Sequence, residues 1–584
     1  MRRSYENIVK EHIIPIRNKL CDEAVLKKHE MNIDGIVAFG DHIPFSAGGM
    51  FNTYTHIILN EREDEIDDRM LNTLKDLLMF SLEYKVDTFG ILSLLSSLYT
   101  YKKEGMLEKL LDDKELQEIN NRLDWRVFVE QDTLKLKGTR PFNYYSVAFR
   151  VAKLREKLGF ETEKYSDIFL NIYLEHAKKC SINGWYMDET MGEGRFDRYT
   201  TIVPAELADL YDFVGEETPE SVKIMLRKSC DIYLKMANEQ GYGYAYGRSL
   251  GAHGDTGAIE VLPISAKIGI LNEEETNIAY AYTVKCAQRI VDFWFDKETE
   301  LVNLWDKGRT IDEYRNKSRI FGVNIDICMK LVYAGEIWKE LDLCDKLPIR
   351  DYSEKLLNMG KTGLYIFDQQ TYKRGLALVR DREHVFQLPI INGGKGGYGK
   401  TAYLPLPYET FFIEGTPDED RAYLTPQLIL NNGIKLMPLS YFSDIEENIE
   451  EDCYTVCYKT DALCKIGEKE NQKYDTITSI TKYVFKQGSI IREDEFYISG
   501  DEKVDKVIME FNTFSDNPLI LNNRISFGEG LIKDFECNMK LRSMENVCDN
   551  AKYFTPNGPT KYTFKYEYDN IDSKKIKIRW KINY

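Results

Sequence analysis

The stretch Gly241–Asp255 (GYGYAYGRSLGAHGD) concentrates residue types that could bind a sugar and move protons. Tyr242 and Tyr246 offer flat apolar rings with a polar edge, which suits stacking on a sugar. Arg248 and His253 add a cation and a titratable ring to a glycine-rich segment, where the backbone can approach a ligand closely. His253 could equally be a hydrogen-bonded structural histidine. The Gly-Lys-Ser/Thr ending of a phosphate-binding loop is absent, so this stretch does not predict a nucleotide site.

A second stretch, Asn183–Tyr199 (NGWYMDETMGEGRFDRY), has a composition with no obvious role in a core. It contains four aromatic residues, four acids and two arginines around three glycines. Trp185 is a candidate platform for a sugar ring, or an aromatic cap over a helix end. Asp188, Arg195 and Arg198 are candidate ligands for a polar substrate, although the acids could also be surface charges.

Two further segments could line the same site. Pro141 disfavours helical geometry in the residue before it, so a helix should start near Asn143. Asn143 is then either a plain N-cap or an amide donor at the mouth of a pore, next to the phenol of Tyr144. The glycine-rich segment Asn392–Tyr403 contains Tyr398, either in a loop that folds back onto the site or at a solvated hairpin tip.

The composition excludes several classes of protein. The chain has 584 residues, of which 43% are hydrophobic and 30% charged, which is ordinary globular usage. Its formal charge of −17 lacks the basic excess expected of a general nucleic-acid binder. The uncharged apolar stretch Thr88–Tyr101 has fourteen residues, too few to span a bilayer, so no membrane association is predicted.

The cysteines and the N-terminus suggest a compartment. Eleven scattered cysteines are typical of reduced thiols, and the N-terminal residues lack the apolar core of a secretion signal, so we expect a cytoplasmic protein. The only cysteine cluster is Cys453, Cys457 and Cys464, which lacks a fourth soft ligand in zinc-type spacing. No metal and no cofactor are predicted, and the oligomeric state is left open.

The elements that must position these residues fall into two parts, α+β in class. Up to about residue 350 the apolar spacing is mostly helical, with breakers between the segments, which predicts helical hairpins in an α/α toroid, complete or incomplete, or in a solenoid. The predicted helices are Ile66–Tyr84, Phe89–Tyr101, Tyr144–Leu158, Tyr165–Lys179, Pro204–Phe213, Pro219–Asn238, Ile259–Leu271, Glu275–Phe295 and Asp312–Leu341.

Two other textures complete the chain. Met31–Leu59 is rich in glycine, aromatic and β-branched residues and is interpreted as a short hairpin or a loop at the mouth of the ring. From residue 351 to 584, polar and apolar residues alternate, as in Asp475–Gly500, which predicts a large antiparallel β-sandwich. We therefore predict a toroid domain, 1–350, and a sandwich domain, 351–584.

The loops, in this order of domains, resemble those of the chondroitin AC, hyaluronate and heparinase-type polysaccharide lyases. More closely, NGWYMDETMGEGRFDRY, YGRSL at Tyr246–Leu250 and YGKTAY at Tyr398–Tyr403 resemble segments of an uncharacterised bacterial family of the same superfamily. That family carries a DGWY…FDYY loop, a YGRSLTYR segment and a YGKFAY-like segment. The resemblance implies a uronate-cleaving lyase that acts by β-elimination on an acidic oligosaccharide or polysaccharide.

The resemblance also implies roles for individual residues. Asn143 would neutralise the uronate carboxylate, and Tyr199 matches the acid–base tyrosine. The lyase histidine nine residues earlier is replaced by Thr190. Of the two arginines in the lyase motif GRSISR, Arg248 matches the first, while the second falls on Ala252, beside His253. His253 could therefore stand in for the missing histidine.

Two other functions fit the same residues. A glycoside hydrolase needs two carboxylates at roughly 5–5.5 Å or roughly 6.5–9.5 Å, for which Asp188, Glu189, Asp197 and Asp255 are candidates. A non-catalytic carbohydrate-binding protein would use the same cleft without proton transfer.

Overall fold

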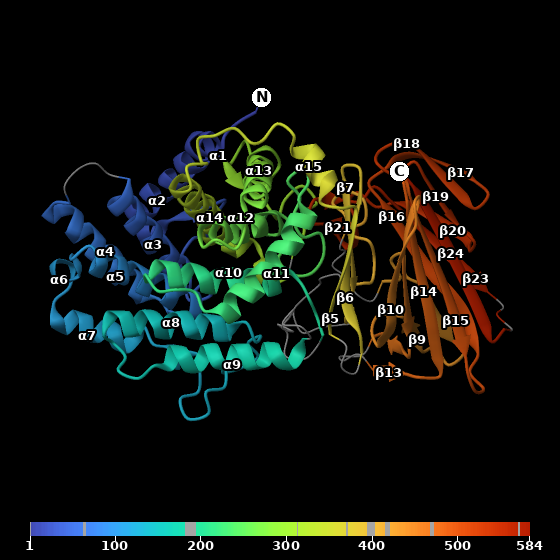
Figure 1. Cartoon of the computed structure of the whole chain (residues 1–584), viewed down its shortest axis with the longest axis horizontal. Coiled ribbons are helices and arrows are strands. Elements are labelled where there is room, and N and C mark those ends of the chain that lie inside the picture. Colours follow the sequence, from blue (N-terminus) through green and yellow to red (C-terminus); the bar gives the residue numbers. More distant parts are fainter. Residues whose placement is uncertain are drawn as a thin grey trace.

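The computed structural model describes residues 2–61, 66–181, 194–311, 313–368, 372–393, 403–414, 421–467, 472–569, 571 and 573–584. In this part of the chain, helices form one end of the molecule and antiparallel sheets the other (Figure 1). The α+β class and the order of the two parts are as predicted. No described helix combines the length and the apolar character needed to cross a membrane.

Six helices form a closed inner ring. Each contacts the next along the chain and the last contacts the first, so the arrangement is a toroid and not an open solenoid. The ring consists, in order, of α3 (Ser46–Asn60), α5 (Thr88–Lys103), α8 (Tyr144–Leu158), α10 (Arg198–Phe213), α12 (Ala252–Lys267) and α14 (Ile320–Glu340).

Outer helices return the chain between the inner ones. Helices α4, α9, α11 and α13 pack on α3, α8, α10 and α12 respectively, and α2 packs on α14. Their bounds are α2 (Ile14–Lys27), α4 (Asp68–Glu83), α9 (Tyr165–Cys180), α11 (Glu220–Met236) and α13 (Glu273–Arg289); the shorter helices are α1 (Tyr5–Ile8), α6 (Leu107–Leu110), α7 (Asp113–Arg122) and α15 (Tyr352–Asn358).

Four of the predicted segments differ from the structure. The segment predicted as a hairpin or loop has two short strands, β1 (Asn32–Ile33) and β2 (Ile36–Val37), but continues into α3, because Ala47, Phe51, Tyr54 and Ile58 recur at helical spacing and are buried. Helix α10 starts before Pro204, at Arg198, and α12 starts before Ile259, at Ala252. The residues 313–319, predicted as part of a helix, form 3₁₀ turns at Glu313–Arg315 and Lys317–Arg319 instead.

The strands form two large sheets and one small one. The order of the first is β10-β11-β14-β15-β24-β19-β18-β17 and that of the second β13-β12-β9-β8-β16-β23-β20. Every described ladder between these strands is antiparallel. Their bounds are β8 (Gln427–Leu430), β9 (Lys435–Met437), β10 (Phe442–Ile449), β11 (Cys453–Thr460), β12 (Leu463–Lys465), β13 (Gln472–Tyr474), β14 (Ile477–Lys486), β15 (Ser489–Ile498), β16 (Val504–Thr513), β17 (Asp516–Leu521), β18 (Arg524–Glu529), β19 (Asp534–Cys537), β20 (Lys540–Asn546), β23 (Tyr562–Asp569) and β24 (Lys575–Asn583).

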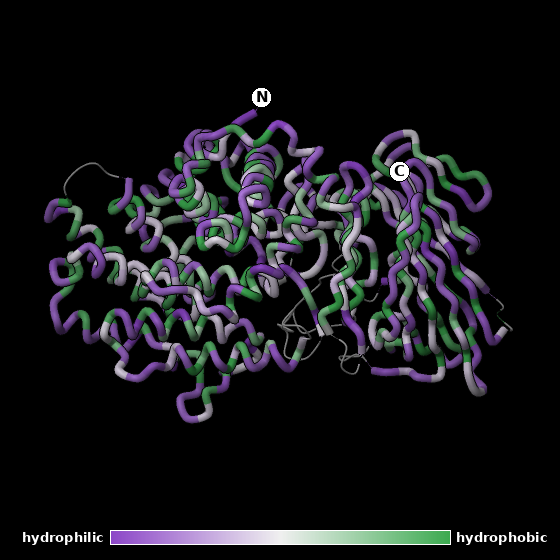
Figure 2. Tube along the Cα trace, viewed as in Figure 1, coloured by the Kyte–Doolittle hydropathy of each residue, from purple (hydrophilic) through white to green (hydrophobic). Residues whose placement is uncertain are grey.

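The two large sheets pack face to face as a sandwich. Phe511 of β16 stacks on Phe535 of β19, with ring centroids 4.0 Å apart, across the space between the sheets. Hydrophilic and hydrophobic residues alternate along strands such as β14 (Figure 2), and its burial alternates in step. Two further strand pairs, β3 (Phe295–Asp296) with β4 (Leu301–Val302) and β21 (Phe554–Thr555) with β22 (Gly558–Pro559), are short hairpin-like ladders.

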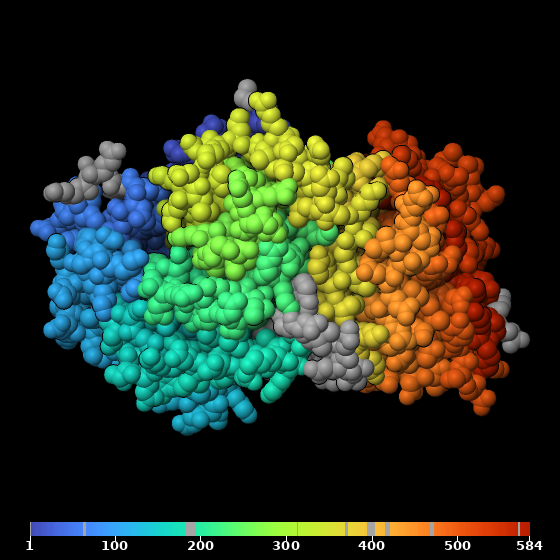
Figure 3. Space-filling model, in the orientation of Figure 1, coloured from blue at the N-terminus to red at the C-terminus, as the bar shows by residue number. Residues whose placement is uncertain are grey.

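The small sheet connects the two halves. Its strands β5 (Thr362–Asp368), β6 (Arg374–Asp381) and β7 (His384–Ile390) lie between the helices and the sandwich (Figures 1 and 3). Every residue of β7 is buried. The side chain of Gln387 accepts from the backbone of Ala245 (3.1 Å) and donates to Gly243 (2.8 Å), so the sheet fixes the glycine-rich stretch of the toroid.

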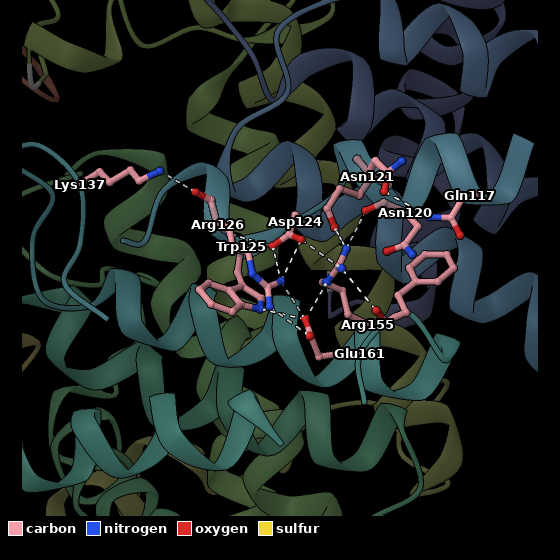
Figure 4. Close-up of polar contacts among 11 residues, drawn as sticks. Gln117, Asn120, Asn121, Asp124, Trp125, Arg126, Lys137, Arg155 and Glu161 are labelled. Carbon is pink, nitrogen blue, oxygen red and sulfur yellow. Dashed lines mark hydrogen bonds and ion pairs between the residues drawn. The ribbon is translucent and has the colours of Figure 1, made fainter. Parts of the chain in front are cut away.

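A separate ion network joins the C-terminal part of α8 to the segment Asp124–Arg126. Arg155 of α8 bonds to Asp124 (3.2 Å) and Glu161 (3.4 Å), and Arg126 contacts the same two carboxylates at 3.0 and 3.1 Å (Figure 4). Each guanidinium here faces carboxylates, so the cluster is internally neutralised. It is a structural network and offers no free charge to a ligand.

The close backbone contact between Gly243 and Gly254 gives a prediction about stability. A methyl group at Gly243 would overlap the carbonyl of Gly254 in the first turn of α12. We expect Gly243→Ala to lower the free energy of unfolding by about 3 kcal/mol. The control Gly49→Ala places its methyl group in open space on α3 and should stabilise the chain by about 1 kcal/mol. Denaturant unfolding measures both, and equal effects would contradict this close contact.

Candidate functional site

The inner helices bring their N-terminal ends together at one mouth of the ring. Gly48 of α3 packs on Gly90 of α5, and Phe89 at the start of α5 lies 5.8 Å from the ring of Tyr144 at the start of α8. Helix N-termini carry partial positive charge from their unpaired N–H groups. An arrangement of six parallel starts therefore favours an anionic ligand at this end of the toroid.

Tyr199, in the first turn of α10, is the centre of a hydrogen-bonded cluster at this mouth. Its hydroxyl lies 2.7 Å from Oγ of Ser249 and accepts from Nη2 of Arg315 at 2.8 Å. Nε of Arg315 also donates to Ser249 (2.7 Å), whose Oγ is 2.7 Å from the hydroxyl of Tyr314. Tyr199 as a residue is partly exposed at this mouth.

The charges around Tyr199 favour its ionised form. Burial by itself raises the pKa of the phenol, but the guanidiniums of Arg315 and Arg198 and the hydrogen bond from Ser249 outweigh it, so the pKa lies below the usual 10.0. The effect is mutual. Burial disfavours the charged form of Arg315, but Tyr199 and Tyr314 outweigh this and raise the pKa of Arg315. The phenolate form of Tyr199, which is the form that can act as a base, is therefore favoured relative to that of an ordinary tyrosine.

The backbone at Ser249 is held in an unusual conformation. Ser249 is fully buried and has φ of 55°, in the left-handed region that non-glycine residues rarely adopt. Such strain persists only where the surroundings over-determine it. Here the hydroxyl of Ser249 joins three side chains of the cluster, which is consistent with a positional requirement at this residue.

His253 contacts the Tyr199 cluster through Arg315. It lies in the first turn of α12, is fully buried, and its Nε2 accepts from Nη1 of Arg315 at 3.1 Å. Burial, and then the charges of Arg315 and Lys330, hold its pKa well below 6.5. The neutral ring thus has Nε2 as acceptor and the proton on Nδ1, which has no hydrogen-bond partner among the described residues.

A second buried layer fixes the ring of Tyr199. Asp197 caps α10 by accepting from the backbone N–H of Tyr199 and forms an ion pair with Nε of Arg248 at 2.8 Å. The guanidinium of Arg248 lies 4.8 Å from the centre of the Tyr199 ring. Tyr403 donates to the same carboxylate at 2.6 Å. Arg248 is therefore neutralised by Asp197 and positions the phenol.

Two other predicted arginines also face the interior. Arg195 lies 4.3 Å from the ring centre of Tyr403, and Arg198 forms an ion pair with Glu260 of α12. Both side chains are at least 97% buried. The structure brings them near Tyr199 but gives them no face toward a large ligand.

Asn143 and Tyr144 lie at the mouth, at the start of α8. Asn143 occupies the N-cap position, but its side chain makes no capping bond, and its Oδ1 has no hydrogen-bond partner in the described part of the chain. Tyr144 is partly exposed. Burial and the phenol of Tyr199 raise its pKa, while Arg319 lowers it, which places all three groups in one electrostatic neighbourhood.

The other predicted residues lie elsewhere. Tyr246 is completely buried and stacks on Tyr408 with centroids 5.9 Å apart, so it belongs to the core between the halves. Tyr242 packs under Arg289 (4.3 Å), and burial raises its pKa to about 12. Trp185, Asp188 and Tyr398, together with Glu189 and Thr190, lie outside the described residues.

The sequence analysis missed the segment that completes the cluster. Tyr314, Arg315 and Arg319 fall in the region predicted as helix, and no role was assigned to Ser249. Asn316 and Ser318 could have marked a helix start, because both are favoured at N-caps and Asn316 does accept from the backbone of Ser318. The apolar periodicity after residue 320 extended the prediction backward over them.

The structure gives no sign of a metal centre in the described residues. No group of three or more His, Cys, Asp and Glu side chains there converges on a point. Cys453 and Cys457 belong to β11 of one large sheet, whereas Cys464 belongs to β12 of the other.

Comparisons with known proteins give remote structural matches only. No family model and no curated protein matches the sequence. A chondroitin AC lyase mutant of Streptomyces coelicolor A3 aligns with a TM-score of 0.47 and 11% identity over 98% of this chain and 79% of that one. A mutant of the heparan sulfate lyase HepC from Pedobacter heparinus aligns with a TM-score of 0.32 and 10% identity over 97% of this chain and 82% of that one. At these scores the likeness supports no conclusion about function.

The environment of Tyr199 gives a measurable prediction. We expect the pKa of the Tyr199 phenol to lie below 10 in the native chain and to rise in Arg315→Gln, because that variant removes the nearest positive charge. Carbon NMR of ring-labelled tyrosine, with Tyr199→Phe to assign the signal, measures the titration. An unchanged pKa in Arg315→Gln would refute the coupling, and Tyr568→Phe in the sandwich serves as the assignment control.

Proposed function

We propose that this protein is a lyase that cleaves uronate-containing acidic oligosaccharides or polysaccharides by β-elimination at the N-terminal mouth of the toroid. One observation carries the proposal: the phenol of Tyr199, a partly exposed residue, has a lowered pKa and is held by a guanidinium that has no carboxylate partner among the described residues. A phenolate base beside cations suits the removal of a weakly acidic C–H next to a carboxylate.

The proposed reaction uses the phenol twice. The Tyr199 phenolate takes the proton from the carbon next to the uronate carboxylate, and the C–H electron pair forms a carbon–carbon double bond as the glycosidic C–O bond breaks. The same phenol then returns that proton to the leaving sugar oxygen. No water is consumed, and the products are an unsaturated uronate and a free hydroxyl.

The substrate carboxylate must be stabilised while negative charge builds on it. The side chain of Asn143 makes no capping hydrogen bond to the backbone of α8, and Asn143 lies at the start of that helix beside Tyr144. Arg315 and the helix N-termini supply positive potential at the same mouth. We assign Asn143 to the carboxylate and Arg315 to the phenolate, with His253 and Arg248 as positioning residues.

The two candidate carboxylates in the described part of the chain, Asp197 and Asp255, do not favour a hydrolase. Asp197 is bound by Arg248 and Tyr403, and Asp255 by Arg289 at 2.8 Å and by the indole N–H of Trp294 at 2.7 Å. Each is at least 96% buried. A general acid or nucleophile must reach the glycosidic bond, so neither of these described carboxylates is placed for that work.

The reaction has a distinctive product. Incubation with uronate oligosaccharides should produce new ultraviolet absorbance from the conjugated double bond, and Tyr199→Phe should reduce the rate by roughly 10²–10⁴-fold, the usual contribution of acid–base catalysis. Tyr568→Phe in the sandwich should retain the native rate. New reducing ends without that absorbance would show hydrolysis and overturn the proposal.

The pH profile tests the role of Arg315. The base must be deprotonated, so the rate should rise with pH through the lowered pKa of Tyr199. Removing the charge in Arg315→Gln raises that pKa, so the rising limb should move to higher pH, with the greatest loss of rate at low pH. Steady-state rates over a pH series measure the limb, and Arg315→Lys, which keeps the charge, should show a smaller shift. A uniform loss with no shift would contradict the assignment.

A further inference from the structure

Arg319 is a cation without an obvious purpose in the fold. It precedes α14 and is only partly buried. Its backbone N–H donates to the carbonyl of Asn316, but the structure gives its guanidinium neither a hydrogen bond nor an ion pair within the described residues. By contrast, Arg126 and Arg155 of the structural network each bind two carboxylates (Figure 4). A half-buried guanidinium without a carboxylate partner among the described residues, in a chain of charge −17, is available to bind an external anion.

The neighbours of Arg319 are rings and cations. Its guanidinium lies 5.0 Å from the ring centre of Phe45, at the start of α3, and 5.8 Å from that of Tyr314. Burial and then the charge of Arg315 lower its pKa. The guanidinium of Arg315 lies 5.6 Å from the centre of the same Tyr314 ring and donates to the Tyr199 phenol. Two guanidiniums four residues apart thus repel each other, and the phenols of Tyr314, Tyr144 and Tyr199 oppose this by raising the pKa of Arg319.

Arg319 and Phe45 lie where the starts of α3 and α14 meet, and a second, independent feature of this junction is the buried hydroxyl of Ser46. Oγ of Ser46 is 98% buried and has no hydrogen-bond partner in the described part of the chain. It lies 2.9 Å from where a methyl group on Gly322 would be, in the first turn of α14. Neither helix has an acidic residue in its first turn or a side chain capping its N-terminus. The junction combines a free hydroxyl, two uncapped helix starts and Arg319.

We propose that Arg319, at the junction of α3 and α14, forms a second anion subsite beside the Tyr199 cluster. This inference rests on the proposed function. Asn143 and Arg315 serve the uronate and the phenolate, so Arg319 is left for another acidic group on the adjoining sugar. The preferred substrate therefore carries two anionic groups on neighbouring rings, either a uronate next to a sulfated sugar or two consecutive uronates.

Binding measured without turnover tests the subsite. In a Tyr199→Phe background, calorimetry at constant ionic strength would compare three tetrasaccharides: sulfated chondroitin, unsulfated chondroitin and oligogalacturonate. One of the two ligands with anions on neighbouring rings should bind at least 10-fold more tightly than unsulfated chondroitin. Arg319→Gln should reduce that preference at least 5-fold, whereas Arg524→Gln on β18, which removes the same charge in the sandwich, should leave it unchanged.

The outcomes separate this inference from the proposed function. Equal losses for all three ligands in Arg319→Gln, no preference in the parent, or no binding of any tetrasaccharide would overturn the subsite. Failure of the lyase proposal would instead appear as the absence of unsaturated product from chains that retain Tyr199. Whichever of the two acidic ligands binds more tightly identifies the second anion as sulfate or carboxylate.

Discussion

The account depends on one contact, the hydrogen bond and charge attraction between the Arg315 guanidinium and the Tyr199 phenol. It joins α10 to the loop before α14, and through Ser249 and His253 the same guanidinium reaches α12. Without it the phenol would lose the largest of the charges that lower its pKa against the opposing effect of burial. With it, three segments far apart in sequence form one reactive group.

The toroid makes this contact possible through the direction of its helices. Because outer helices return the chain, the inner helices start at the same mouth. Residues near those starts therefore meet although they lie far apart in sequence: Tyr199 contacts Ser249, 50 positions away, and Arg315, 116 positions away. The small sheet β5-β6-β7 holds the glycine-rich stretch from behind through Gln387. The buried pair of Asp197 and Arg248 then sets the tyrosine ring, so cations that look suited to a substrate in the sequence are used inside the protein.

Sequence reasoning succeeded where the signal was local. The periodicity of Tyr144–Leu158 gave the helix with its observed bounds, and alternation gave the strands of the sandwich. It failed where the environment of a side chain depended on partners far along the chain. The motif YGRSL alone does not indicate whether Arg248 faces solvent or pairs with Asp197. It also failed at 313–319, because the apolar repeat of α14 extended the predicted helix over the two 3₁₀ turns that carry Arg315 and Arg319. Trp185, Asp188 and Tyr398 lie outside the described residues, so their roles stay predictions.

The most direct test is a crystal structure of the Tyr199→Phe variant with an acidic tetrasaccharide bound. The account predicts a uronate ring at the N-terminal mouth of the toroid, its carboxylate on the Asn143 amide and the adjoining C–H facing the ring at position 199. A sugar bound at the opposite mouth or on the sandwich, or a uronate turned with its carboxylate away from Asn143, would contradict it.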